Sequence, residues 1–218
     1  MNRRLQGRLL ATVLLAAACC PACGQGTFQN LNFEQANVPD VPAHQFGSDV
    51  SASDGVPGWV VYTYGGPASS MFHNNISTGA AEVAIYGPQW FSDQILEGRY
   101  TVSLQPATAG PPGTAAIGQT GQFPVDAESL TFYGRGAFTV TFGGQSIQLV
   151  SVGSTSAYTI FGGDISTFAN QTGELMFQGG GLLDAIQFSN QPMPEPGVFA
   201  LSALGALLLG WRVVGRRR

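Results

Sequence analysis

The chain has 218 residues, with 9 Arg plus Lys against 13 Asp plus Glu, and this length allows one domain or two small ones at most. Every basic residue is Arg, and residues 25–193 carry twelve acidic and two basic side chains, a formal charge of −10. This segment cannot assemble the basic face that nucleic-acid phosphates require, so we expect no nucleic-acid partner. With 44% hydrophobic residues in the chain, it is too apolar for a disordered acidic tail and is expected to fold.

The first 24 residues have the order of a secretory signal peptide. Three Arg within residues 3–8 precede an apolar run at 9–18, and small residues follow through Gly24. The apolar run is too short to span a bilayer comfortably. Ala22 and Gly24 predict cleavage after Gly24, by signal peptidase after export through the Sec translocon.

All three cysteines, Cys19, Cys20 and Cys23, fall inside this segment. Cleavage after Gly24 would leave a mature domain without thiols, and therefore without disulfides, cysteine nucleophiles or thiolate metal sites. The alternative is a lipoprotein signal in which Cys19 or Cys20 is acylated. Three Ala precede Cys19, but the Leu lies one position too far upstream for a good match.

Residues 25–190 are predicted to form an all-β domain, an antiparallel β-sandwich or jelly roll. Apolar and polar residues alternate in short runs, which is typical of strands with one buried face, and Gly- and Pro-rich turns separate the runs. Nine or more strands at this spacing favour a sandwich or a jelly roll. The apolar positions are Leu31 and Phe33; Trp59 and Val61; Val83 and Ile85; Tyr100, Val102 and Leu104; Leu130 and Phe132; Phe138, Val140 and Phe142; Ile147 and Leu149; Leu175 and Phe177; Ile186 and Phe188; turns are expected at Gly65-Gly66, 111–113, Gly134, Gly143-Gly144, Gly162-Gly163 and 179–181.

Within residues 25–190, the clearest exception to strand is a short helical segment. Asp164 can cap a single helical turn over Asp164–Asn170, with Phe168 packed inward.

The C-terminal segment, 191–218, is predicted to be a membrane anchor. An apolar stretch from Gly197 to Gly215 would span about 28 Å as a helix, close to the thickness of a hydrocarbon core, if Arg212 extends towards the tail side. The Arg cluster at Arg216, Arg217 and Arg218 predicts a cytoplasmic C-terminus, which agrees with an exported middle domain. Composition alone would make this an ordinary tail anchor.

The triplet Pro194, Glu195 and Pro196 immediately before the apolar stretch makes the ending more specific. The run from Met193 to Arg218 resembles the PEP-CTERM sorting tail, which consists of this triplet, one transmembrane stretch and a terminal Arg cluster. The resemblance implies recognition by exosortase, a membrane-embedded processing enzyme, in a Gram-negative bacterium that makes exopolysaccharide or biofilm matrix. It also implies an inner-membrane intermediate that is later released to the cell surface or matrix.

A second resemblance rests on the two ends of the middle domain. The runs at 30–34, 57–59 and 183–188 are similar to carbohydrate-binding-module jelly rolls of the galactose-binding type. In many such modules the opening Glu and the closing Asp bind a structural calcium ion, which would make Glu34 and Asp184 ligands here. Calcium takes six to eight oxygen ligands, whereas the resemblance identifies only these two residues as ligands. The alternative is a carboxylate that is bonded to backbone amides or faces water.

Aromatic side chains could supply platforms for a glycan. Trp90, beside Pro88 in a loop-like run, and Tyr64 are the leading candidates, although such residues are more often part of a core.

Catalytic motifs are not apparent, and we expect a protein that is not an enzyme. His44 and His73 lie in polar, loop-like surroundings without a nucleophile elbow or a metal-ligand spacing. No Lys is present and the mature domain would lack Cys, so Ser-Lys and Cys-His dyads cannot form. A hydrolase that uses paired carboxylates stays an unspecific alternative.

These features together predict an exported surface or matrix protein associated with exopolysaccharide. Two alternatives are a carbohydrate-binding module and an uncleaved inner-membrane protein. No cofactor is expected apart from the calcium ion considered above.

Overall fold

The computed structural model describes residues 26–43 and 45–193, and the predicted signal peptide and sorting tail lie outside this part. The described chain is all-β, as predicted, and within it no helix has the length and apolar character needed to cross a membrane. The elements are β1 (Asp49–Ser51), α1 (Ala52–Gly55), β2 (Val60–Thr63), β3 (Gly66–Ala68), β4 (Ser70–His73), β5 (Glu82–Tyr86), η1 (Ser92–Gln94), β6 (Thr101–Gln105), β7 (Ala115–Gln122), β8 (Ser129–Phe142), β9 (Gln145–Ile147), β10 (Leu149–Ser154), β11 (Thr159–Asp164), η2 (Ser166–Phe168) and β12 (Thr172–Ser189).

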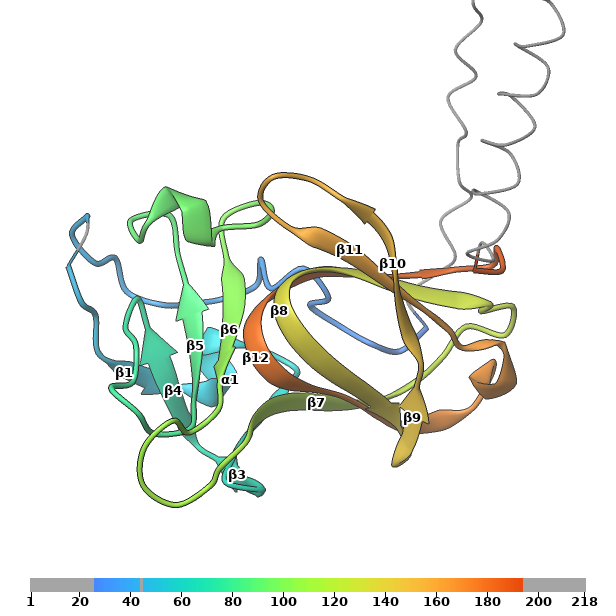
Figure 1. Cartoon of the computed structure of the whole chain (residues 1–218), viewed down its shortest axis with the longest axis horizontal. Coiled ribbons are helices and arrows are strands. Elements are labelled where there is room, and N and C mark those ends of the chain that lie inside the picture. Colours follow the sequence, from blue (N-terminus) through green and yellow to red (C-terminus); the bar gives the residue numbers. More distant parts are fainter. Residues whose placement is uncertain (1–25, 44, 194–218) are drawn as a thin grey trace, which may run out of the picture.

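The strands form one continuous sheet (Figure 1). Its main path runs β1-β4-β5-β6-β12-β7-β2-β3, and β8 lies on the other side of β12, where it also pairs with β9 and β11. Strand β10 pairs with β11. The expectation of a wholly antiparallel sheet is wrong at one place, because β4 and β5 run parallel, with His73 opposite Ile85.

Strands β8 and β12 form a long antiparallel ribbon that curves strongly (Figure 1). The predicted turns at Gly134 and 179–181 are wrong, because the two strands run through these positions without a break. The predicted turn at Gly162-Gly163 is wrong for the same reason, since both residues lie within β11. The turn at Gly143-Gly144 is confirmed as the loop between β8 and β9.

The glycines of the ribbon permit its bend. Gly181 lies opposite Gly136 and has a φ of +144°, and a Cβ on Gly181 would lie 2.2 Å from the Arg135 carbonyl oxygen. Only glycine fits such an approach of two backbones. Beyond the bend β12 changes partner, from β7 over residues 172–179 to β6 over Gly181–Leu183. The sheet thereby folds over on itself and encloses a core.

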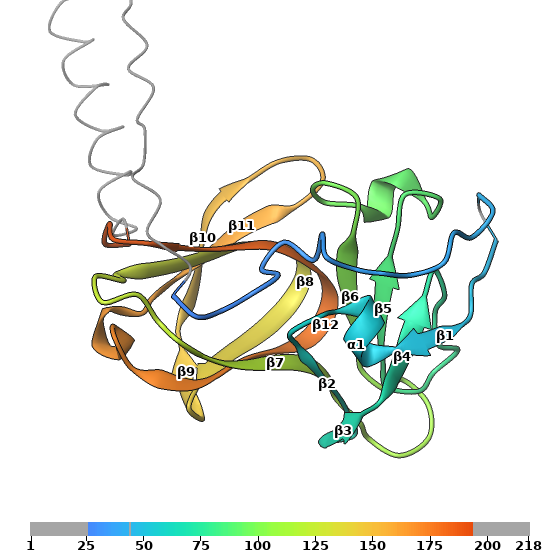
Figure 2. The ribbon, with the colours of Figure 1, turned by 180° about the vertical axis from the view of Figure 1, so that it is seen from behind.

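The segment before β1 is not the strand expected at Leu31 and Phe33. It runs along the length of the domain (Figures 1 and 2), and turns rather than ladder pairs occupy these positions. Asn30 and Phe33 have φ of +51° and +58°, which breaks an extended strand. Leu31 and Phe33 are nevertheless buried. Their predicted burial is therefore confirmed, whereas the predicted strand conformation is wrong.

The expected helical turn is present as the 3₁₀ helix η2. The Ser166 amide donates to Asp164 Oδ1 at 2.8 Å, and Phe168 is buried. Helix α1 was not foreseen, although Ser51 caps it by accepting from the Asp54 amide.

The core is rich in phenylalanine. Phe123 touches three other rings, those of Phe28, Phe142 and Phe188, at centroid separations of 4.5–5.2 Å. A second, smaller cluster is separate from this core and contains Tyr86, Trp90, Leu96 and Leu182, with partly buried aromatic rings packed against it.

Candidate functional site

A cavity of about 240 Å³ opens beside an irregularity in β12. The pairing of β12 with β8 shifts register between Asp184 and Gln187, and Ala185 has a φ of +48°. The Ile186 amide leaves the ladder and donates to the Leu31 carbonyl at 2.9 Å. This bulge separates the strands locally and draws in the N-terminal segment, which closes one side of the cavity.

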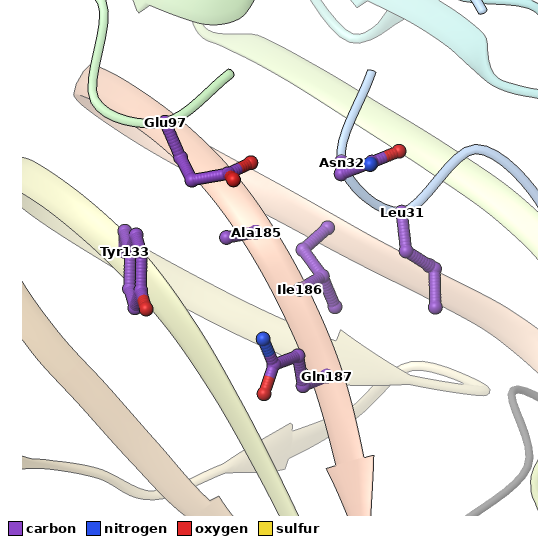
Figure 3. A pocket seen from close by; sticks show the side chains of 7 residues that line it. All are labelled: Leu31, Asn32, Glu97, Tyr133, Ala185, Ile186 and Gln187. Atoms are coloured by element: carbon purple, nitrogen blue, oxygen red, sulfur yellow. The ribbon is translucent and has the colours of Figure 1, made fainter. Parts of the chain in front are cut away.

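The cavity has an apolar floor and a polar rim (Figure 3). Buried Ala185, Ile186 and Leu31 lie at the bottom. The rim is formed by four side chains that Figure 3 shows around this floor: Asn32, Glu97, Tyr133 and Gln187. The exposed lining is more polar than apolar, and such convergent polar groups suit a small polar ligand.

Three side chains of the rim have unused hydrogen-bonding capacity. Asn32, Glu97 and Gln187 are exposed, and within residues 26–43 and 45–193 none of these three side chains makes a hydrogen bond or an ion pair. They offer one carboxylate and two amides to a ligand. No Arg lines the cavity, so the Glu97 carboxylate faces it without a basic neighbour.

The fourth rim residue, Tyr133, is held by a second tyrosine. Its ring stacks on Tyr158 with centroids 4.3 Å apart and an angle of 11° between the planes. Burial, followed by the Tyr158 hydroxyl, raises the pKa of Tyr133, so the phenol is neutral at physiological pH. Tyr158 does not line the cavity, and its contact fixes the Tyr133 ring beside the floor.

Asp184 lies next to the cavity and is completely buried. Its Oδ2 accepts from Thr101 Oγ1 at 2.6 Å and from the Glu97 amide at 3.2 Å, and its Oδ1 accepts from the Ala185 amide at 2.7 Å. Burial raises the pKa of Asp184 to about 7, although these hydrogen bonds oppose the rise. The carboxyl is therefore ready to exchange a proton near neutral pH.

Glu34 contacts the same turn from the other side. Its Oε1 accepts from the amides of Arg99 and Tyr100 at 2.7 and 3.1 Å. Gly98, with a φ of +60°, allows the close approach, since a Cβ there would lie 2.3 Å from Oε1. The structure thus brings the two predicted calcium ligands to one segment, residues 97–101.

This arrangement does not fit a calcium ion as it stands. Both carboxylates already accept backbone amides, which is the alternative that the sequence left open. Among the described residues no group of three or more His, Cys, Asp or Glu is placed to hold a metal ion. Calcium takes six to eight oxygens, and the calcium site stays a prediction.

The predicted glycan-contact aromatics lie elsewhere. Trp90 is only 4% exposed and packs on Tyr86, with ring centroids 5.3 Å apart. The exposed rings beside it are those of Phe91 and Phe46. Tyr64 is 48% exposed, and its hydroxyl accepts from the Ala81 amide. Neither Trp90 nor Tyr64 lines the cavity.

His73 is buried, whereas His44 and the residues of the sorting motif, Pro194–Pro196 and Arg216–Arg218, lie outside the described part of the chain. Burial lowers the pKa of His73, and the charge of Asp40 acts in the opposite direction.

Sequence reasoning missed most of the cavity. Asn32 and Gln187 lie inside two of the three runs that carried the carbohydrate-module resemblance, so a partial signal existed. No sequence signal points to Glu97 or Tyr133, because each is a single residue that only the fold brings to β12.

Comparison with known proteins gives a distant match in structure alone. No family model matches the chain, and no curated protein does. A Stig cyclase, Fisc from Fischerella sp. TAU, in complex with (3Z)-3-(1-methyl-2-pyrrolidinylidene)-3H-indole, is similar at a TM-score of 0.44 and 14% identity over 79% of this chain and 100% of that one. An apo cyclase from Fischerella sp. is similar at a TM-score of 0.43 and 14% identity, over 80% of this chain and 99% of that one.

Proposed function

We propose that the protein is an exported, non-enzymatic surface or matrix protein that exosortase sorts through its C-terminal tail. The observation that carries this proposal is the order of Pro194–Pro196, the apolar stretch 197–215 and the Arg cluster 216–218. The last strand, β12, ends at Ser189, so the triplet follows the folded domain after a short connection. Proline on both sides of Glu195 favours an extended chain, which suits a peptide that a processing enzyme must bind.

Intact-mass analysis of envelope and medium fractions, with and without exosortase in the host, tests this proposal. The expected product begins at Gln25 and ends near Pro194, and it depends on exosortase. Replacement of Glu195 by Ala should leave the tail attached. A protein that keeps Arg218 in both strains would instead be an uncleaved inner-membrane protein.

The fold of the exported domain is proposed to be a jelly roll. The long ribbon of β8 and β12, which folds back at its glycines, and the antiparallel pairing of all neighbours except β4 and β5 support this assignment.

Carbohydrate binding is a second candidate function, and the cavity at β12 favours it. Sugars are recognised by a few directional hydrogen bonds together with contact to an aromatic ring. Amides of Asn32 and Gln187, the Glu97 carboxylate and the Tyr133 ring supply these groups around one apolar floor. The domain would then attach the protein to exopolysaccharide after processing.

Retention of the full chain on immobilised exopolysaccharide from the host tests this candidate. The double replacement of Asn32 and Gln187 by Ala should weaken retention without affecting the fold, because both side chains are exposed and unbonded within the described residues. A matched variant, Tyr64→Phe, leaves the cavity intact and should be retained as the wild type is. Loss of retention in a folded Tyr64→Ala or Trp90→Ala variant would place the glycan on the predicted aromatics instead.

The proposal of a non-enzymatic protein has its own test. Asp184 and Glu97 are the carboxyls nearest the cavity, and a hydrolase would need them to act as acid and base on a bound glycan. We expect no turnover on a broad glycan panel. Activity that is lost in both Asp184→Asn and Glu97→Gln would replace the non-enzymatic proposal with a hydrolase.

A further inference from the structure

We propose that the cavity at β12 selects a ligand that carries a protonated amine, such as an amino-sugar unit of a polysaccharide, over neutral and acidic ligands. This inference rests on the carbohydrate-binding candidate and specifies the ligand for the same cavity.

The rim of the cavity carries a negative charge that no basic side chain of the described domain neutralises. Glu97 is exposed at the cavity, and its carboxylate has no hydrogen-bond or ion-pair partner within the described residues. The two basic side chains of the described domain are occupied elsewhere, because Arg99 lies over the Tyr100 ring and Arg135 donates to the Asp93 carbonyl. A cationic group of the ligand is the natural partner for such a carboxylate.

A buried acid, Asp184, lies behind the rim. Asp184 accepts from the Glu97 amide, so the two acidic residues adjoin at one end of the cavity. The negative charge of Glu97, and that of Asp184 when it is ionised, repels carboxylates and sulfates from this end. Acidic sugars are therefore disfavoured.

The Tyr133 ring forms an aromatic wall of the cavity. Tyr133 is held against Tyr158 and stands beside the floor that Ala185 contributes (Figure 3). An ammonium group near an aromatic face gains a cation–π attraction, and a carboxylate on the neighbouring wall adds to it. The amide oxygens of Asn32 and Gln187 can accept the remaining N–H groups. Carboxylate, aromatic ring and carbonyl oxygens together make an ammonium-binding set.

Calorimetric titration of the detergent-solubilised full chain tests the proposal with four probes: glucosamine, N-acetylglucosamine, glucose and glucuronate. At a pH where the amine is protonated, we expect glucosamine to bind about tenfold more tightly than glucose or N-acetylglucosamine, because a charged hydrogen bond is added. Glucuronate should bind most weakly.

Two variants link this preference to the cavity. Glu97→Gln keeps the shape of the rim and removes its charge, so the preference for glucosamine over glucose should fall to within about twofold. Glu128→Gln removes a carboxylate that does not line the cavity, and it should leave the preference unchanged.

The outcomes separate the two proposals. Equal binding of glucosamine, N-acetylglucosamine and glucose would overturn the amine preference and leave carbohydrate binding standing. Binding of glucosamine without glucose would support the amine site and count against a general glycan site. A preference that persists in Glu97→Gln would overturn the assignment to this cavity, and no binding of any probe would overturn both proposals.

Discussion

Glu34 and Asp184 accept hydrogen bonds from one turn, residues 97–101, Asp184 from its two ends and Glu34 from its middle. Glu34 Oε1 lies 2.7 Å from the Arg99 amide nitrogen, and Asp184 Oδ2 lies 2.6 Å from Thr101 Oγ1. One carboxylate comes from the segment before β1 and the other from the last strand, so the two ends of the domain meet at this turn. Because the turn also carries the rim carboxylate of the cavity, both acids position that charge.

The first prediction concerns the dependence of stability on pH through Asp184. Its pKa rises from 3.8 to about 7 on folding, so the folded state binds this proton more tightly than the unfolded state does. The corresponding stabilisation is complete below about pH 4 and is lost as the pH rises through 7, with a magnitude of about 4 kcal/mol. Asp184→Asn should remove this slope, as measured by urea unfolding across that range.

A matched variant separates this effect from general acid titration. Glu128→Gln should keep the slope of the wild type. If Asp184→Asn retains the full slope, the carboxyl does not titrate as described. A calcium ion at Asp184 and Glu34 would give a different signature, since EDTA would then lower stability above pH 7, where Asp184 is ionised.

The second prediction concerns the bend of the β8 and β12 ribbon. Gly181→Ala places a Cβ against the Arg135 carbonyl at a φ that L-residues rarely adopt, and it should lower the free energy of unfolding by about 2–4 kcal/mol. Gly66→Ala is the control, because a Cβ at Gly66 would meet nothing within 4 Å. Chemical denaturation measures both variants. Equal stability of the two would mean that the ribbon can relax around the added methyl group.

The glycines also explain where sequence reasoning failed on the fold. Clustered glycine normally indicates a turn, and at 179–181 it marks a bend inside a continuous strand instead. Strand β7 escaped notice because Ala115–Gln119 is buried on both faces and shows no alternation of apolar and polar residues. Alternation did locate β6, where Val102 and Leu104 are buried and Ser103 between them is half-buried.

The site was predictable only in part, for a similar reason. Asp184 alternates with Ile186 and Phe188 in the run 183–188, and it is buried as they are. It contacts the same turn as Glu34, while the calcium site that the resemblance implies stays a prediction. The cavity depends on the bulge after Asp184 and on the left-handed conformation of Ala185. Alanine gives no sequence signal for that conformation, so neither Glu97 nor Tyr133 could be placed beside it.

The third prediction concerns the aromatic core. Phe123 is 1% exposed and contacts the rings of Phe28, Phe142 and Phe188. Phe123→Ala should lower the free energy of unfolding by about 3–5 kcal/mol, because the cavity that it leaves is bounded by rigid strands. Phe46→Ala, at a ring that is 64% exposed, should change it by less than about 0.5 kcal/mol. A small effect of Phe123→Ala in thermal and urea unfolding would show that the neighbouring rings close the space.

The fourth prediction concerns His73, whose titration opposes that of Asp184. His73 is 2% exposed, and its Nδ1 has no hydrogen-bond partner among the described residues. Burial lowers the pKa of His73 in the folded protein below its ordinary value of 6.5, and the charge of Asp40 only partly offsets this. The stability that the neutral ring contributes is therefore present above pH 6.5 and is lost as the pH falls below it.

His73→Met tests this directly, because methionine fills a similar volume without a titrating group. The variant should match the wild type at pH 8 within about 1 kcal/mol, since no hydrogen bond of the ring is lost, and should be more stable than the wild type near pH 5. Combined with Asp184→Asn it should leave a shallower pH dependence between pH 4 and 7, to which Glu82 still contributes because burial raises its pKa as well. A double variant that still follows the slope of either single variant would show that the pH dependence arises from another group.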